Sequence, residues 1–282
     1  MLPLPTRLRA DLAPALLLVA HGSRDPAAAQ THARLVRLVG ESAPGLEVAL
    51  CHVDHTEPSV SGALDGFAAA GREVVAMPLL LSAAAHSKGD IPGALQAAAA
   101  RHGGLRVRYA GVLGPHPLLL SALVGRLAEA GVDDGSAVVL AAAGSADPDA
   151  NADVARTARL LWEWRGGAPV EAAYASATVP TVAEAVDRLR RLGHDRIAVA
   201  SYFLAPGRLP SAVRTAAGGL PVTAPLGDTR GVAALVLERY AESLAGHVAA
   251  NCDTCQHRTP WPGREHRVGA PQQPHRHPAD PA

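Results

Sequence analysis

Apolar and polar positions in the first half of the chain follow two alternating patterns. A short continuous apolar run, typical of a strand buried on both faces of a parallel sheet, lies at 14–20. A second buried strand is predicted at 73–81, and further strands are predicted at 46–53 and 105–112. Apolar residues recur at helical spacing over 26–41, 58–70, 90–101 and 118–130. Strands and helices that alternate in this order predict an α/β fold with an open parallel sheet.

Local signals mark the ends of several predicted helices. Asp25 and Pro26 form an N-cap and first turn for the helix over 26–41, and Asp90 is expected to cap the helix that follows it. Gly71 and Gly131 are expected to end the helices that precede them.

The pattern then repeats in the second half. AHGSRDP at 20–26 matches AAGSADP at 142–148, an offset of 122 residues. The same offset, without a gap, pairs Thr56 with Thr178, Pro58 with Pro180, Asp65 with Asp187 and Gly71 with Gly193. A fixed offset over this length indicates tandem duplication of one α/β domain. We therefore predict an extension at 1–14, a catalytic domain at 15–131, a degenerate second domain at 132–247 and a Cys-, His- and Pro-rich tail at 248–282.

Composition narrows the class of protein. Lys+Arg 26 balances Asp+Glu 26, which disfavours a nucleic-acid binder, and 48% hydrophobic residues suffice for a core. Three cysteines make no disulfide framework. No apolar run reaches the roughly 18 residues of a membrane span, and the first residues contain prolines and charges instead of a signal peptide. We expect a cytoplasmic protein without nucleic-acid or membrane partners, either a monomer or a homodimer.

Polar residues gather where the predicted strands end. His21 follows the first strand, Glu57 follows the second and His86 follows the third. Ligands of open parallel sheets bind at the carboxyl ends of the strands, so two imidazoles and a carboxylate are expected on one rim. Imidazole is a ligand for divalent iron, cobalt, nickel and zinc, and a carboxylate accepts protons. His52, Asp54 and His55, nearby on the same loop, are expected at the surface or around the site.

The duplication provides an internal control for these residues. Gly22, Ser23, Asp25 and Pro26 persist in the second copy, whereas the counterparts of His21 and Glu57 are Ala143 and Val179. The loop that carries His86 is shortened there, and Arg208 stands near its place. The second copy kept the scaffold and lost the polar chemistry, which favours a catalytic role for the lost residues.

These residues also carry a family resemblance. LLLVAHGSRDP, the EPS after the second strand and PLLLxxxxHxxxDIP after the third resemble the sirohydrochlorin chelatase family, class II tetrapyrrole chelatases of siroheme and cobalamin synthesis. The resemblance spans both halves, from about residue 15 to 244. It implies insertion of Co²⁺ or Fe²⁺, as substrate, into sirohydrochlorin, a polycarboxylate macrocycle.

The resemblance also implies residue roles. The family's two metal-site histidines fall on His21 and His86, and its acidic residue falls on Glu57. Ser23, Ser82 and Lys88, together with Arg24, Ser87 and backbone N–H groups at helix starts, are candidates for binding the macrocycle's carboxylates.

The tail contains a second candidate metal-binding group. Cys252, Cys255 and His257 form a Cys-x-x-Cys-x-His group, and long relatives of this family carry such a motif with an iron–sulfur cluster. Two thiolates fall short of the four that a [4Fe–4S] cluster normally uses, so a cluster there needs histidine ligands or ligands from a second chain. Cluster binding, zinc binding and no metal role all remain open. The principal alternative function is a non-catalytic metal or tetrapyrrole delivery protein; a protoporphyrin chelatase and a binding-protein-type receptor fit the pattern less well.

Overall fold

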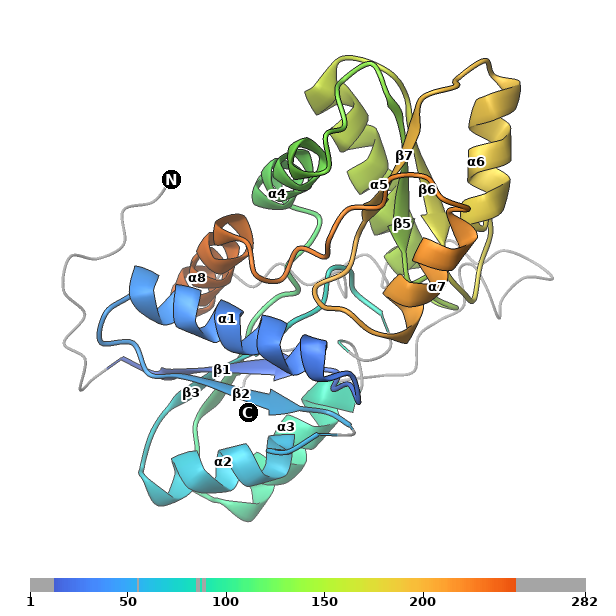
Figure 1. Cartoon of the computed structure of the whole chain (residues 1–282). Helices are drawn as coiled ribbons and strands as arrows, with labels where there is room; N and C mark the ends of the chain where they lie inside the picture. Colours follow the sequence, from blue (N-terminus) through green and yellow to red (C-terminus); the bar gives the residue numbers. More distant parts are fainter. Residues whose placement is uncertain (1–12, 55, 85–86, 88–89, 247–282) are drawn as a thin grey trace.

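The computed structural model describes residues 13–54, 56–84, 87 and 90–246, and it forms two α/β lobes side by side (Figure 1). His55, His86, Lys88 and the tail with Cys252, Cys255 and His257 lie outside the described residues. No helix in the described ranges has both the length and the apolarity to cross a membrane.

The first lobe contains a parallel four-stranded sheet in the order β2-β1-β3-β4. Its strands are β1 (Ala15–Ala20), β2 (Val48–His52), β3 (Val74–Pro78) and β4 (Val107–Tyr109). The helices that follow them in the chain are α1 (Pro26–Ser42), α2 (Val60–Ala69), α3 (Ile91–Arg101) and α4 (Pro117–Glu129). The predicted order of elements is confirmed, although each strand is shorter than the range predicted for it.

The second lobe contains a parallel three-stranded sheet in the order β6-β5-β7. Its strands are β5 (Ala137–Ala142), β6 (Val170–Tyr174) and β7 (Ile197–Ser201). The helices are α5 (Pro148–Arg165), α6 (Val182–Arg191), α7 (Arg208–Ala216) and α8 (Arg230–Leu244). A single parallel bridge between Val199 and Val222 stands where the first lobe has its fourth strand.

One core joins the two lobes. One apolar cluster contains buried residues of β1 and β3 from the first sheet and of β5 from the second sheet. Helices α1, α4, α5 and α8 also contribute to this cluster. The opposite faces of the sheets are covered separately, by α2 with α3 and by α6 with α7. The last helix, α8, returns to the first lobe, because the Tyr240 hydroxyl donates to the Pro14 carbonyl at 2.7 Å and Arg239 donates to the Val112 carbonyl at 2.9 Å. The return of α8 and the shared core hold the lobes together.

The duplication is visible in backbone geometry. Ala20 pairs with His52 in the first sheet, and Ala142 pairs with Tyr174 in the second. Glu57–Pro58 and Val179–Pro180, at the same offset, are both cis peptide bonds. The two copies therefore preserve the connection after the edge strand as well as the sheet, and tandem α/β repeats are confirmed.

The helix-end signals hold with one exception. The Asp25 carboxylate accepts the Ala27 N–H at 2.9 Å as expected of an N-cap. Gly71 and Gly131 follow their helices with positive φ angles of 62° and 71°. The prediction for Asp90 is wrong: its backbone is already helical and its side chain makes no capping hydrogen bond.

Candidate active site between the lobes

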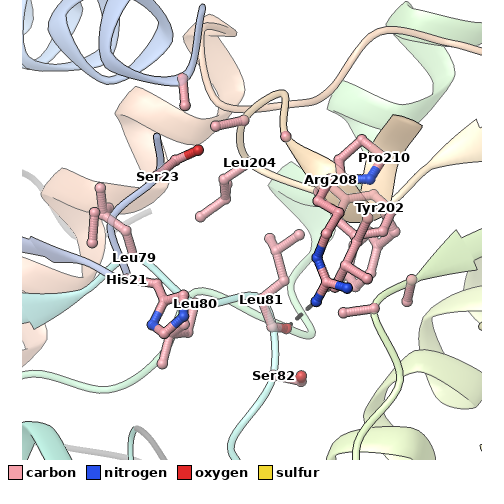
Figure 2. Close-up of a pocket in the computed structure, with 18 of the residues that line it drawn as sticks. His21, Ser23, Leu79, Leu80, Leu81, Ser82, Tyr202, Leu204, Arg208 and Pro210 are labelled. Atoms are coloured by element: carbon pink, nitrogen blue, oxygen red, sulfur yellow. Dashed lines mark hydrogen bonds between the residues drawn. The ribbon is translucent and has the colours of Figure 1, made fainter. Parts of the chain in front are cut away.

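A cavity of about 1010 Å³ lies between the carboxyl ends of the two sheets (Figure 2). The first lobe lines it with the loops after β1 and β3, and the second lobe lines it with the loops after β5 and β7. Open parallel sheets bind ligands at this edge, and the duplication sets two such edges against each other. The result is one chamber with two different walls.

The loop after β1 carries His21 into this cavity. The next residue, Gly22, has a φ of +100°, and a Cβ there would lie 1.8 Å from the Asp54 carbonyl oxygen. The Asp54 N–H donates to the His21 carbonyl at 2.9 Å. Only glycine permits this close approach, so the loops after β1 and β2 are held together and the exposed His21 side chain leaves the strand at a fixed point.

A tight turn follows at the start of α1. The Ser23 Oγ accepts the Asp25 N–H at 3.1 Å, and the hydroxyl hydrogen remains available for a ligand. The second copy repeats this turn, with Ser145 Oγ accepting the Asp147 N–H at 3.0 Å. Ser23 and the exposed Arg24 both line the cavity, which fits their predicted contact with carboxylates.

Glu57 stands apart from this chamber. Its side chain is exposed, and one carboxylate oxygen, Oε2, accepts the Ser59 N–H at 2.7 Å. The described lining of the cavity does not include Glu57, although the Thr56 hydroxyl beside it donates to the Ser23 carbonyl at 3.2 Å. Thr56 thus ties this loop to the turn after β1, and Glu57 is the next residue along the chain.

The loop after β3 contributes Ser82 to the cavity. Ser87 has another role, which corrects its place among the carboxylate-binding candidates. It is buried, its Oγ donates to the Ala84 carbonyl at 2.9 Å, and its own carbonyl accepts the Tyr109 hydroxyl at 2.9 Å. The Ser87 hydroxyl is therefore used within its own loop and is not available for a carboxylate.

The second lobe supplies the opposite wall. Figure 2 shows Tyr202, Leu204 and Arg208 across the cavity from His21. The Tyr202 hydroxyl makes a long hydrogen bond of 3.4 Å to the Leu81 carbonyl and so connects the two walls. Arg208, the first residue of α7, is exposed and adds a positive charge to the cavity lining.

The comparisons with known proteins agree with this architecture. The model of the CbiX family matches residues 15–130 and again 137–243, once for each lobe. The chain belongs to the CbiX family. The resemblance drawn from the motifs is therefore confirmed, and the chain is a two-lobed member.

Individual CbiX relatives span most of this chain. A sirohydrochlorin cobaltochelatase of Priestia megaterium is 31% identical over 258 residues, 86% of this chain and 84% of that protein. A sirohydrochlorin ferrochelatase of the same organism is 29% identical over 210 residues, 72% of this chain and 78% of that protein. A solved structure of SirB from Bacillus subtilis with Fe³⁺ superposes with a TM-score of 0.71 at 25% identity, covering 86% of this chain and 98% of SirB.

A buried histidine pair lies below the cavity of this CbiX protein. His32 of α1 lines the cavity, and His52, the last residue of β2, lies beside it with ring centroids 6.2 Å apart. Of the two positions expected for His52, at the surface or around the site, the structure shows the second, because only 6% of it is exposed and its neighbour lines the cavity. His32 escaped the sequence analysis, although its place among Ala28, Leu35 and Val39 on the apolar face of α1 was a usable signal.

Burial determines the charge of this pair. Burial and the neighbouring His52 lower the pKa of His32 to about 4. Burial also lowers the pKa of His52, against the opposing effects of the Pro58 carbonyl and the Glu57 charge. His32 is therefore neutral at neutral pH.

Proposed function

We propose that this protein is a sirohydrochlorin chelatase that inserts Co²⁺ or Fe²⁺ into the macrocycle. The observation that carries the proposal is the chamber between the lobes, with His21 on its wall, in a chain whose relatives include a cobaltochelatase and ferrochelatases. In the reaction, two pyrrole N–H groups each lose a proton. The nitrogen lone pairs bind the divalent cation, and the products are the metallated macrocycle and two protons.

His21 and His86 hold the incoming cation in this proposal. Neutral imidazole binds both borderline metals, so these ligands do not by themselves choose between iron and cobalt. The protein must bind the cation through few ligands, because the cation has to pass to the macrocycle. The macrocycle nitrogens replace the protein ligands one at a time, and a coordination shell filled by protein ligands would retain the ion.

Glu57 accepts a pyrrole proton in this proposal. Its position beside the cavity instead of within the lining favours transfer through water. The Ser59 N–H binds one carboxylate oxygen, so the other oxygen takes this role in the proposal.

Both lobes bind the carboxylates of the macrocycle in this proposal. Ser23, Ser82, Lys88 and Arg24 act from the first lobe, and Arg208 acts from the second. An arginine guanidinium forms paired hydrogen bonds with a carboxylate, which fixes the orientation of the macrocycle as well as attracting it. The second lobe thus lost the residues for metal handling but supplies a wall for the substrate.

The test is anaerobic absorbance spectroscopy of sirohydrochlorin mixed with Co²⁺ or Fe²⁺. The wild-type protein should accelerate metallation above the protein-free rate. His21→Ala should abolish that acceleration, and Glu57→Gln should lower the rate while binding of the macrocycle persists. The ratio of the two metal rates bears on the pathway that the protein serves.

The same assay separates an enzyme from a delivery protein. A delivery protein would bind cation and macrocycle without accelerating metallation, and Glu57→Gln would leave it unaffected. No acceleration with either metal would overturn the proposed function.

A further inference from the structure

The buried histidine pair has no role in the proposed chelatase reaction. His32 is 7% exposed and His52 is 6% exposed, so each is more than nine-tenths buried. Buried imidazoles normally bond through their nitrogens to protein or water, because an unpaired buried polar atom costs about 1–3 kcal/mol.

Both side chains leave a nitrogen unpaired. The Nδ1 atoms of His32 and His52 are buried and have no hydrogen-bond partner among the described residues. His32 lines the cavity and His52 is its neighbour, so the pair adjoins the cavity. Two such nitrogens in adjacent rings favour a ligand that both can bind.

Charge and distance restrict the class of ligand. A neutral imidazole has a lone pair for a cation, and burial favours that form of both rings. Metal–nitrogen bonds of about 2.1 Å allow the centroids of two imidazoles on one ion to lie up to about 6.5 Å apart. The observed separation of 6.2 Å is within this reach, so the distance between the rings permits one ion to bind both.

The second lobe provides a comparison within the same chain. At the offset of 122 residues, Val154 stands for His32 and Tyr174 stands for His52. The Tyr174 hydroxyl donates to the Asn151 carbonyl at 3.0 Å, and Val154 packs in the shared core. The fold therefore does not require imidazoles at these two positions, which weakens a purely structural explanation of the pair.

We infer that His32 and His52 form a second site for a divalent transition-metal cation, separate from the site proposed at His21 and His86. Two imidazoles leave most of the coordination shell to water, so the ion is held weakly and exchanges with the cavity. Such a site holds a substrate cation near the reaction chamber. The binding site itself does not depend on the insertion reaction.

The experiment measures Co²⁺ bound to the full-length protein by equilibrium dialysis and elemental analysis. Four proteins are compared: wild type, His32→Val, His21→Ala and His194→Ala. His32→Val copies the residue of the second lobe, and His194→Ala removes a histidine from the loop before β7 as a matched control. Every protein carries the same tail, so cobalt bound there cancels in the differences.

We expect His32→Val to lose close to one equivalent of Co²⁺ per chain and His194→Ala to lose none. In the wild-type protein, Zn²⁺ should shift the ¹⁵N resonances of the His32 and His52 rings, a measurement that needs no variant to fold. Unchanged cobalt in His32→Val, or ring resonances that Zn²⁺ leaves in place, would overturn the inference and leave a pair bridged by water only.

The two proposals fail separately. Loss of cobalt in His21→Ala with none in His32→Val supports the chelatase site alone. Loss in His32→Val together with unaccelerated metallation by the wild type supports the second site and refutes the proposed function.

Discussion

Replacing His32 by valine should flatten the dependence of stability on acid pH. The His32 pKa is about 4 in the folded protein, against 6.5 for an ordinary histidine. As pH falls below 6.5, the unfolded chain binds a proton at this residue before the folded chain does, and unfolding becomes easier. The linked stability is complete above pH 6.5 and is lost progressively down to about pH 4.

The size of the effect follows from these two pKa values. Between pH 7.5 and pH 5.0, protonation of His32 in the unfolded state alone costs the wild-type protein about 2 kcal/mol. His32→Val lacks this cost. His52 is present in both proteins, so the loss linked to its lowered pKa cancels in the comparison, and the difference should be about 2 kcal/mol.

Urea denaturation at the two pH values, with a chelator to keep metal away, measures the effect. The wild type should lose about 2 kcal/mol more than His32→Val over this interval. His194→Ala, which also lacks one histidine, should lose as much as the wild type. Equal losses in the wild type and His32→Val would refute the argument that burial keeps His32 neutral.

Three further predictions concern the loops and walls of the site. Gly22→Ala and Gly144→Ala both place a Cβ within 2.0 Å of a backbone carbonyl oxygen at positive φ, so each should lower the free energy of unfolding of its lobe by more than about 2 kcal/mol in urea denaturation. Among the folded molecules, Gly22→Ala should lower the metallation rate far more than Gly144→Ala. Equal rates would contradict the assignment of the site to the first lobe. Arg208→Ala should raise the KM for sirohydrochlorin about tenfold, with kcat and the KM for metal little changed. Arg208→Lys should restore only part of the affinity for sirohydrochlorin. A KM identical to that of the wild type would show that Arg208 does not bind the macrocycle. Thr181→Ala removes the capping box of α6 and should cost about 1 kcal/mol of stability without changing metallation, whereas a change in metallation would mean that α6 is coupled to the site.

Sequence patterns were sufficient for the repeated architecture because their signals are local or periodic. Six fully buried positions in β1 appear as an unbroken apolar run, since both faces of a parallel strand are covered. The offset between the copies needed only residue identity. His21 was found because a residue that ends a parallel strand lies at the ligand-binding edge of the sheet.

Other features depend on contacts between distant segments. Asp90 matched an N-cap by residue type, but its backbone enters the helix before the side chain can cap it. His52 occupies the end of an edge strand, where exposure is the usual expectation, yet α1 covers it. Ser87 resembled a ligand-binding residue by its place in a loop, but its hydroxyl is used within that loop.

The sequence by itself determined two α/β repeats and the absence from the second of counterparts to His21 and Glu57, because residue identity and spacing record both. The tertiary structure decided that the strand ends of the two repeats face one cavity, that α8 returns to the first lobe and that Arg208 stands across from His21. It also decided that His32 meets His52 out of solvent. These arrangements follow from how one shared core packs, and the packing brings together residues that no local pattern relates.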